Sequence, residues 1–438
     1  MTKDEPSEHR NVDLDEKNPI LDRIAIFGSS GWALLASFLL LLVAIAVNAW
    51  IEGVASPTGI RFVGSKTAAV KQRTDILPMI RSVSYALSSE NPNLPADALA
   101  AYQRDGVIAI RGLLSKELIE ALDPASQQLV NDQQQKNMHR NKPRHSTQFH
   151  TVQLGPIFLS QEAIATPFRN VALGSIIPHI AAQLLGLNSS QSLRVMRDIL
   201  LAKDKDPYVC GYHVDDTGFW PATADSPGVN AWIALDDMPT IHGGGFALAV
   251  GSHIAEYSAI AHKVTGSTKT FPQAGFKDAA DMFANRSGSG TCNLKSSAPE
   301  VNRMMDGSMR VYEVLRGDVI FHDRWLFHRT VPFVDSNDPR IWRRYSVRYA
   351  PGSAVIPPGY GTEPSVLWDD GNGGRTADQV AEFDGPWYPK CWPSVSKDEM
   401  DALPNLLTEK MPKAEELRKR RQKEIKAYLN GRVTYNTN

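Results

Sequence analysis

The chain has 438 residues, of which 47 are Lys or Arg and 48 are Asp or Glu, so its formal net charge is -1. A near-neutral chain has no overall positive field with which to attract a polyanion, and we expect no nucleic-acid partner. The three cysteines, Cys210, Cys292 and Cys391, lie far apart and form no CxxC pair. This spacing excludes a disulfide-rich scaffold and a thiolate zinc site.

An uncharged stretch near the N-terminus predicts a transmembrane helix. No Asp, Glu, Lys or Arg lies between Arg23 and Glu52, and the apolar run exceeds the roughly 20 helical residues that cross a bilayer. Trp32 and Trp50 lie near its two ends, where indole rings favour the membrane interface. A buried core helix and a cleaved signal peptide are the alternatives, but the acidic leader disfavours the second. We therefore expect a single-pass membrane protein.

The charges that flank this span leave its orientation open. Four basic residues precede it within residues 1–23, and four follow it within residues 53–73, so the positive-inside rule favours neither side. Asn188 and Asn285 stand in Asn-x-Ser triplets, which would be glycosylation sites only if the C-terminal part were lumenal.

Composition and pattern divide the chain into five segments. Residues 254–316, inside the largest segment, are rich in Gly, Ser and Asn and predict an insertion or lid. The expected segments are a hydrophilic tail (1–23), the transmembrane helix (24–52), a juxtamembrane linker with a short helix near 76–87 (53–97), a β-rich domain (98–352), and a C-terminal extension that ends in a helix at 413–429 (353–438).

The largest segment begins with mixed elements and becomes rich in β-strands. Residues 95–104 predict a helix, 106–111 a strand, and Ser115 caps a second helix, whereas 131–150 predicts a loop or solvated helix. Short strands are expected at 193–202, 208–213, 229–235, 245–250, 318–321, 328–331 and 345–349. Because no amphipathic helices alternate with these strands, the pattern favours an antiparallel sandwich or jelly roll, an all-β core with flanking helices.

The residues that could perform chemistry are histidines and one aspartate. The sequence has no GxGxxG after a strand, no GxxxxGK[ST], no HExxH and no GxSxG. His213 and Asp215 are two residues apart at the end of an apolar run, so on a strand they share a face and can bind one metal. The third ligand would be His328, with His322 as a competitor; two imidazoles and one carboxylate suit non-haem Fe(II). The alternative for each histidine is a hydrogen-bonded structural role.

Several motifs in order make the chain similar to one family. They are YHVDDTGFWP (212–221), NAWIALDDMPTIHGGGFALAVGSH (230–253), GDVIFHDRWLFHRTVPF (317–333) and RRYSVRY (343–349). Together they resemble the phytanoyl-CoA dioxygenase family of Fe(II)/2-oxoglutarate oxygenases, over roughly residues 102–350. The resemblance implies a cupin-like double-stranded β-helix, with His213, Asp215 and His328 as iron ligands. It also implies Fe(II) as the cofactor, 2-oxoglutarate as the cosubstrate and O2 as the oxidant.

The distal carboxylate of 2-oxoglutarate requires a cation, for which an arginine fork is the natural partner. The candidates near the last predicted strand are Arg340, Arg343 and Arg344. Alternation along this strand places Arg344 on the face of Ser346 and Arg348, and we therefore predict Arg344 as the anchor. The resemblance adds Trp232 and Lys203 as residues near the cosubstrate.

The resemblance implies a dioxygenase that hydroxylates a lipid, an acyl-CoA or a small metabolite and releases succinate and CO2. The apolar stretch at 24–52 adds the expectation that this enzyme is anchored in a membrane. His242 stands where the family usually has Asn, and the insertion before Gly317 is long. Asp215 is retained, which disfavours a halogenase, because a halogenase leaves this coordination site to a halide. The alternatives are a membrane-tethered jelly-roll binding module without turnover and a jelly-roll enzyme that uses another divalent metal. Protein partners are not predicted.

Overall fold

The structure is a computed structural model. It describes residues 80–81, 93–139, 149–153, 162–203, 211–215, 219–265, 267, 269, 294–335, 341–356, 374–383 and 385–429. None of the helices within these ranges is long and apolar enough to cross a membrane. The predicted transmembrane helix at 24–52 lies outside the described residues.

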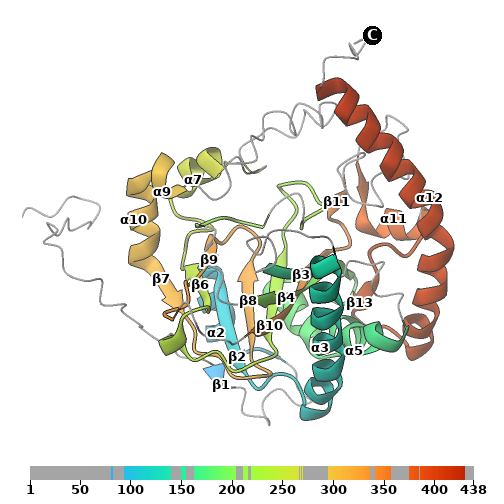
Figure 1. Cartoon of the computed structure of the whole chain (residues 1–438), viewed down its shortest axis with the longest axis horizontal. Helices are drawn as coiled ribbons and strands as arrows, with labels where there is room; N and C mark the ends of the chain where they lie inside the picture. The colour runs from blue at the N-terminus through green and yellow to red at the C-terminus, as the bar shows by residue number, and fades with distance from the viewer. Residues whose placement is uncertain are drawn as a thin grey trace, which may run out of the picture. The chain divides into compact units, whose positions relative to one another are not determined.

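A large sheet of eight strands forms the centre of the fold (Figure 1). Its strands run in the order β1-β2-β8-β5-β10-β4-β13, and β3 also pairs with β4. All of these pairs are antiparallel except β1 with β2. The strands are β1 (Ile80–Arg81), β2 (Val107–Arg111), β3 (Phe149–Gln153), β4 (Leu193–Lys203), β5 (Val229–Ala234), β8 (Val319–Asp323), β10 (Trp342–Pro351) and β13 (Lys390–Trp392).

A smaller sheet packs against one face of the large one. It has the order β7 (Met309–Val311), β6 (Phe246–Ala249) and β9 (His328–Thr330). One buried cluster joins the two sheets, since it holds Trp232 and Ile320 of the large sheet with Phe246 and Leu248 of the small one. The core is therefore two mainly antiparallel sheets, as in a jelly roll, with helices around it. A separate two-stranded pair consists of β11 (Val355–Ile356) and β12 (Arg375–Thr376).

Helices cover the opposite face of the large sheet. They are α2 (Ala96–Asp105), α3 (Lys116–His139), α5 (Glu162–Gly174) and α6 (Ile177–Leu184). On β10, Tyr345, Val347 and Tyr349 belong to the buried cluster on this helical side. The alternate residues, including Arg344 and Arg348, point to the interior between the sheets, where Arg344 lies over the Trp232 ring. The period of two along the strand thus separates an apolar face from a polar one.

The described part of the predicted insertion forms a helical layer behind the small sheet (Figure 1). Its helices are α7 (Ser258–Thr265), α9 (Leu294–Ser297) and α10 (Pro299–Ser308). Leu294, Val301 and Met305 pack with Ala249 of β6 and Phe327 in one buried cluster. Residues 271–293 lie outside the described residues, so the lid remains a prediction.

The structure differs from the predicted elements in several places. Residues 80–81 form strand β1 beside β2 within the segment predicted as a helix at 76–87. Helix α3 continues to His139, which agrees with the helical alternative for the first part of 131–150, but strand β3 at Phe149 was not predicted. The last helix, α12 (Lys397–Leu429), begins well before residue 413. It begins there because Ser396 and Glu399 cap each other: the Glu399 amide donates to Ser396 Oγ, and the Ser396 amide donates to Glu399 Oε2.

The C-terminal extension takes part in the large sheet. Strand β13 pairs with the start of β4, at Lys390 opposite Arg194 and Trp392 opposite Leu193. Helix α11 (Ala377–Phe383) precedes it, and the Asp378 carboxylate accepts hydrogen bonds from Ser192 and Arg194. The β-sheet therefore extends past residue 352, the predicted end of the domain.

Candidate metal centre

The backbone places three predicted metal ligands side by side. His213 and His328 form an antiparallel bridge, in which each amide donates to the other carbonyl at 3.0 and 2.9 Å. Asp215 follows two residues after His213. The ligand atoms of His213, Asp215 and His328 all lie within 4.8 Å of one another. Within the described part of the chain, this is the group of His, Cys, Asp and Glu side chains that could hold a metal ion.

Both imidazoles are oriented in the same way by the backbone. His213 Nδ1 lies 2.9 Å from the Gly211 carbonyl oxygen, and His328 Nδ1 lies 3.0 Å from that of Leu326. Because a carbonyl oxygen only accepts, the hydrogen is on Nδ1 in both rings. The lone pair of each Nε2 is then available for a metal. In metal sites, a hydrogen bond from the other ring nitrogen commonly fixes the tautomer of a histidine ligand in this way.

Asp215 is the anionic member of the group and is 8% exposed. Its Oδ2 accepts hydrogen bonds from Arg348 and, at 3.5 Å, from Asn230, while Oδ1 lies 3.7 Å from His328 Nε2. Burial alone would raise the pKa of Asp215, but Arg348, together with His328 and His213, holds it well below its usual range. The carboxylate is therefore charged at neutral pH, as a metal ligand must be.

His322, the competing third ligand, lies beside this group and not within it. Its side chain is buried on β8, with its ring centroid 5.2 Å from that of His328. Nδ1 lies 3.0 Å from the Asp323 carbonyl oxygen, and Nε2 has no hydrogen-bond partner among the described residues. Burial lowers the pKa of His322 to about 3, so the ring is neutral. The structure thus groups His328, rather than His322, with His213 and Asp215.

Arg344 is a buried cation on the interior face of β10. It is 4% exposed, and its Nε and Nη1 have no hydrogen-bond partner in the described part of the protein. The guanidinium lies 5.7 Å from the ring centroid of Trp232, and that ring stacks on Phe246 at 5.3 Å. Burial lowers the pKa of Arg344 to about 10, which leaves it charged at neutral pH. A buried cation that has no counter-charge in the described ranges is suited to bind an anion.

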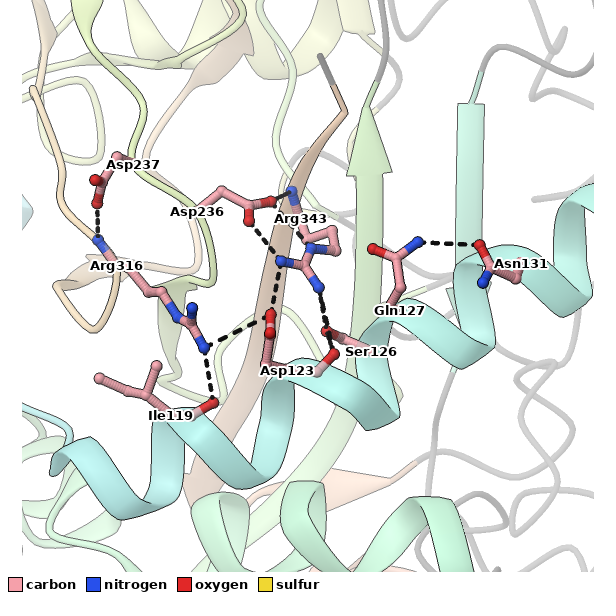
Figure 2. Close-up of polar contacts among 9 residues, drawn as sticks. All are labelled: Ile119, Asp123, Ser126, Gln127, Asn131, Asp236, Asp237, Arg316 and Arg343. Carbon is pink, nitrogen blue, oxygen red and sulfur yellow. Dashed lines mark hydrogen bonds and ion pairs between the residues drawn. The ribbon is translucent and has the colours of Figure 1, made fainter. Parts of the chain in front are cut away.

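Arg343 lies on the opposite face of the same strand, and its donors are in use (Figure 2). Its guanidinium pairs with Asp236 at 2.6 Å and Asp123 at 2.8 Å, and it donates to Ser126 at 3.1 Å. These contacts attach α3 to the end of β10. Arg343 is thus a structural residue, which leaves Arg344 as the available cation of the two.

Two other predicted residues are placed only in part. Arg340 lies outside the described residues. Lys203 is the last residue of β4, where its backbone pairs with Trp342, and its side chain is outside the described part of the structure.

The interior face also carries Asn230 and Arg348, two polar residues that the sequence analysis did not assign to the site. Asn230 of β5 stands opposite His322 on β8 and opposite Arg348 on β10, so these three form one row across the sheet. The alternation along the strands could have placed each of them on this face. It could not have shown that the row lies against Asp215, because that contact joins segments far apart in the sequence.

The fold and the grouped side chains define a jelly-roll protein with a His-Asp-His group that could hold a metal ion. The family model described as phytanoyl-CoA dioxygenase (PhyH) matches residues 102–341, more than half of the chain. The chain therefore belongs to the phytanoyl-CoA dioxygenase family. Membership of this family, with the His-Asp-His group, confirms the prediction of Fe(II), 2-oxoglutarate and O2 as the reagents of the site.

Solved structures give more distant similarities. The non-heme alpha ketoglutarate dependent carbocyclase SnoK from nogalamycin biosynthesis is 20% identical, with 60% of this chain and 87% of that chain covered and a TM-score of 0.40. The epimerase SnoN, in complex with Fe3+, alpha ketoglutarate and nogalamycin RO, is 17% identical, with 67% and 97% covered and a TM-score of 0.44. HygX from Streptomyces hygroscopicus, with nickel and 2-oxoglutarate bound, is 18% identical, with 59% and 88% covered and a TM-score of 0.35. No curated protein matches the chain.

Proposed function

We propose that this protein is a membrane-anchored Fe(II)/2-oxoglutarate-dependent dioxygenase that hydroxylates a lipid, an acyl-CoA or a small metabolite. One observation carries the proposal. A complete His-Asp-His group and a buried arginine without a counter-charge among the described residues lie within the same interior space between the two sheets. Each would be costly to keep in a protein that binds neither a metal nor an anion.

The three ligand residues define how the iron would be held. His213 and His328 would bind it through Nε2 and Asp215 through Oδ1, because the other polar atoms of these side chains already have partners. Three ligands on one face leave the remaining positions for 2-oxoglutarate and dioxygen. When bound, the iron supplies the oxidising chemistry that converts 2-oxoglutarate to succinate and CO2 and hydroxylates the substrate.

Arg344 would bind the distal carboxylate of 2-oxoglutarate. A guanidinium offers two parallel donors to a carboxylate, and burial makes such a pair stronger than it would be in water. Trp232, stacked on Phe246, would form the apolar wall beside the cosubstrate. These buried rings and the apolar cluster between the sheets would keep the surroundings of the cosubstrate apolar at this end of the site.

The membrane location and the substrate class rest on the sequence. The uncharged stretch at 24–52 supports a membrane anchor. An anchored enzyme meets lipid-like molecules at a high local concentration, which favours a hydrophobic substrate. The comparison of lipids and small metabolites from cells with and without the protein would identify that substrate.

The formation of succinate tests the activity. Purified full-length protein with Fe(II), 2-oxoglutarate and O2 should release succinate even without the main substrate, and Asp215→Ala should reduce this release by more than about 100-fold. Asp198→Asn is the control, since Asp198 is equally buried but bonds to Tyr345 on the other face of the sheet. Equal release by wild type and Asp215→Ala would contradict the proposal. Iron binding without the formation of succinate would indicate the alternative, a jelly-roll binding module without turnover.

A further inference from the structure

The two oxygens of the Asp215 carboxylate have different surroundings. Oδ2 accepts from the guanidinium of Arg348, which is 2% exposed, and from the amide of Asn230. Oδ1 faces the other ligands, at 3.7 Å from His328 Nε2. The carboxylate is therefore held by one oxygen and presents the other to the candidate metal site.

The sheet fixes the two donors that hold Oδ2. Arg348 and Asn230 stand opposite each other on β10 and β5. Ser346 donates from Oγ to Asn230 Oδ1 at 2.7 Å, and this bond turns the amide nitrogen of Asn230 toward Asp215. The orientation of Asp215 is thus set by neighbouring strands of the large sheet, which is the most extensively paired part of the fold.

We propose that Arg348 is a positioning residue that, with Asn230, holds Asp215 as a one-oxygen metal ligand. The inference rests on the proposed function of the site. A carboxylate can bind a metal through one or both oxygens. Binding through both would occupy a fourth position of an octahedron and leave too few for a two-point cosubstrate and dioxygen. Occupation of Oδ2 by Arg348 prevents this.

The arrangement has a second consequence that a merely structural arginine would not have. If the Asp215 carboxylate is removed, Arg348 remains as a buried cation beside the space that the carboxylate had filled. Formate, which has the carboxylate group without the chain, matches that space and that charge. Arg348 should therefore bind formate there and present its oxygen to the metal, so that formate restores metal binding to Asp215→Ala.

Cobalt(II) is a suitable probe because its visible spectrum reports the number and geometry of its ligands. Wild type should bind Co(II), and Arg348→Met should bind it about 10-fold to 100-fold more weakly, with an altered spectrum. Arg348→Lys should recover part of the affinity. Arg343→Met is the control, because Arg343 lies on the other face of the same strand, where it pairs with Asp236 and Asp123, and its Co(II) affinity should stay within about twofold of wild type.

The rescue experiment compares Asp215→Ala with Asp215→Ala/Arg348→Met. Formate should restore Co(II) affinity to the single variant and not to the double one. The double variant removes both charges of the buried pair, so it leaves no unpaired ion and should fold even if Arg348→Met alone does not. Wild-type affinity and spectrum in Arg348→Met, or equal rescue of the single and double variants, would overturn the inference. A wild type that fails to bind Co(II) would instead refute the proposed metal centre.

Discussion

Replacing Arg344 with Met should make the metal-free protein more stable while it abolishes cosubstrate binding. Burial lowers the pKa of Arg344 from 12.5 to about 10. At about 1.4 kcal/mol for each pKa unit, this means that burying the unpaired cation costs the folded state roughly 3 kcal/mol. A cation whose folded pKa is lowered binds its proton less tightly when folded, so the cost applies at every pH below about 10.

Met fills a similar volume without a charge, and replacement of buried ions by apolar residues is often stabilising. The free energy of unfolding of Arg344→Met should therefore exceed that of wild type by about 1 to 3 kcal/mol in the absence of ligands. In wild type, 2-oxoglutarate at 100 times its dissociation constant should add about 2.7 kcal/mol in the presence of Mn(II). In Arg344→Met this addition should disappear.

The assay is equilibrium unfolding in urea, performed with Mn(II) alone and with Mn(II) plus 2-oxoglutarate, and in metal-free buffer. Arg343→Met is the control on the other face of the strand. It removes the ion pairs to Asp236 and Asp123, so it should lower stability by about 1 to 3 kcal/mol and keep the response to 2-oxoglutarate. A metal-free Arg344→Met that is less stable than wild type, or one that 2-oxoglutarate still stabilises fully, would refute the reasoning.

Five other substitutions test the fold and the ligand set. Burial raises the pKa of Asp198 to about 7. Between about pH 4 and pH 7 the folded protein therefore keeps a proton that the unfolded chain has lost, and the free energy of unfolding falls as the pH rises through this range. Asp198→Asn should reduce the difference between the free energies of unfolding at pH 5 and pH 8, measured by unfolding in urea. A difference as large as that of wild type would contradict this prediction. Gly106 has φ 72° and its Cβ would lie 2.5 Å from a ring nitrogen, so Gly106→Ala should cost about 2 kcal/mol or more in the same assay. Gly112→Ala, at φ 55° with open space around it, should cost less, and equal losses would contradict the steric argument. In Co(II) titrations, the affinity should fall by more than about 100-fold in His328→Ala and by less than about tenfold in His322→Ala. The reverse order would indicate that His322, and not His328, is the third ligand.

The sequence predicts most of what local periodicity determines. The spacing of His213 and Asp215 and the alternation that separates Arg343 from Arg344 follow from the period of two along a strand, and the structure has the same arrangement. The two-sheet core also follows, because its strands alternate apolar runs with turns. The roles of these residues toward metal and cosubstrate remain predictions.

The sequence does not predict contacts that depend on how distant segments meet. The pair of Arg348 with Asp215 joins residues 133 positions apart, and nothing local in either segment points to the other. The helices of the insertion were missed for another reason: its Gly, Ser and Asn residues favoured a loop, and α9, with four residues, is about one helical turn and too short to show an amphipathic period. By contrast, the Ser396 and Glu399 capping box that starts α12 is a visible signal that the sequence analysis did not use.

The outer edge of β4 shows how two separate parts of the chain cover the sheet that holds the site. Strand β3 covers residues 199–203 of this edge, and β13, from the C-terminal extension, covers 193–194. A long strand with a free edge is a template for pairing with another chain. Here that edge is divided between two short strands from distant parts of the sequence. The C-terminal extension therefore covers one end of this edge: without β13, residues 193–194 would lack a paired strand there, whereas β3, within the segment 98–352, would still cover residues 199–203.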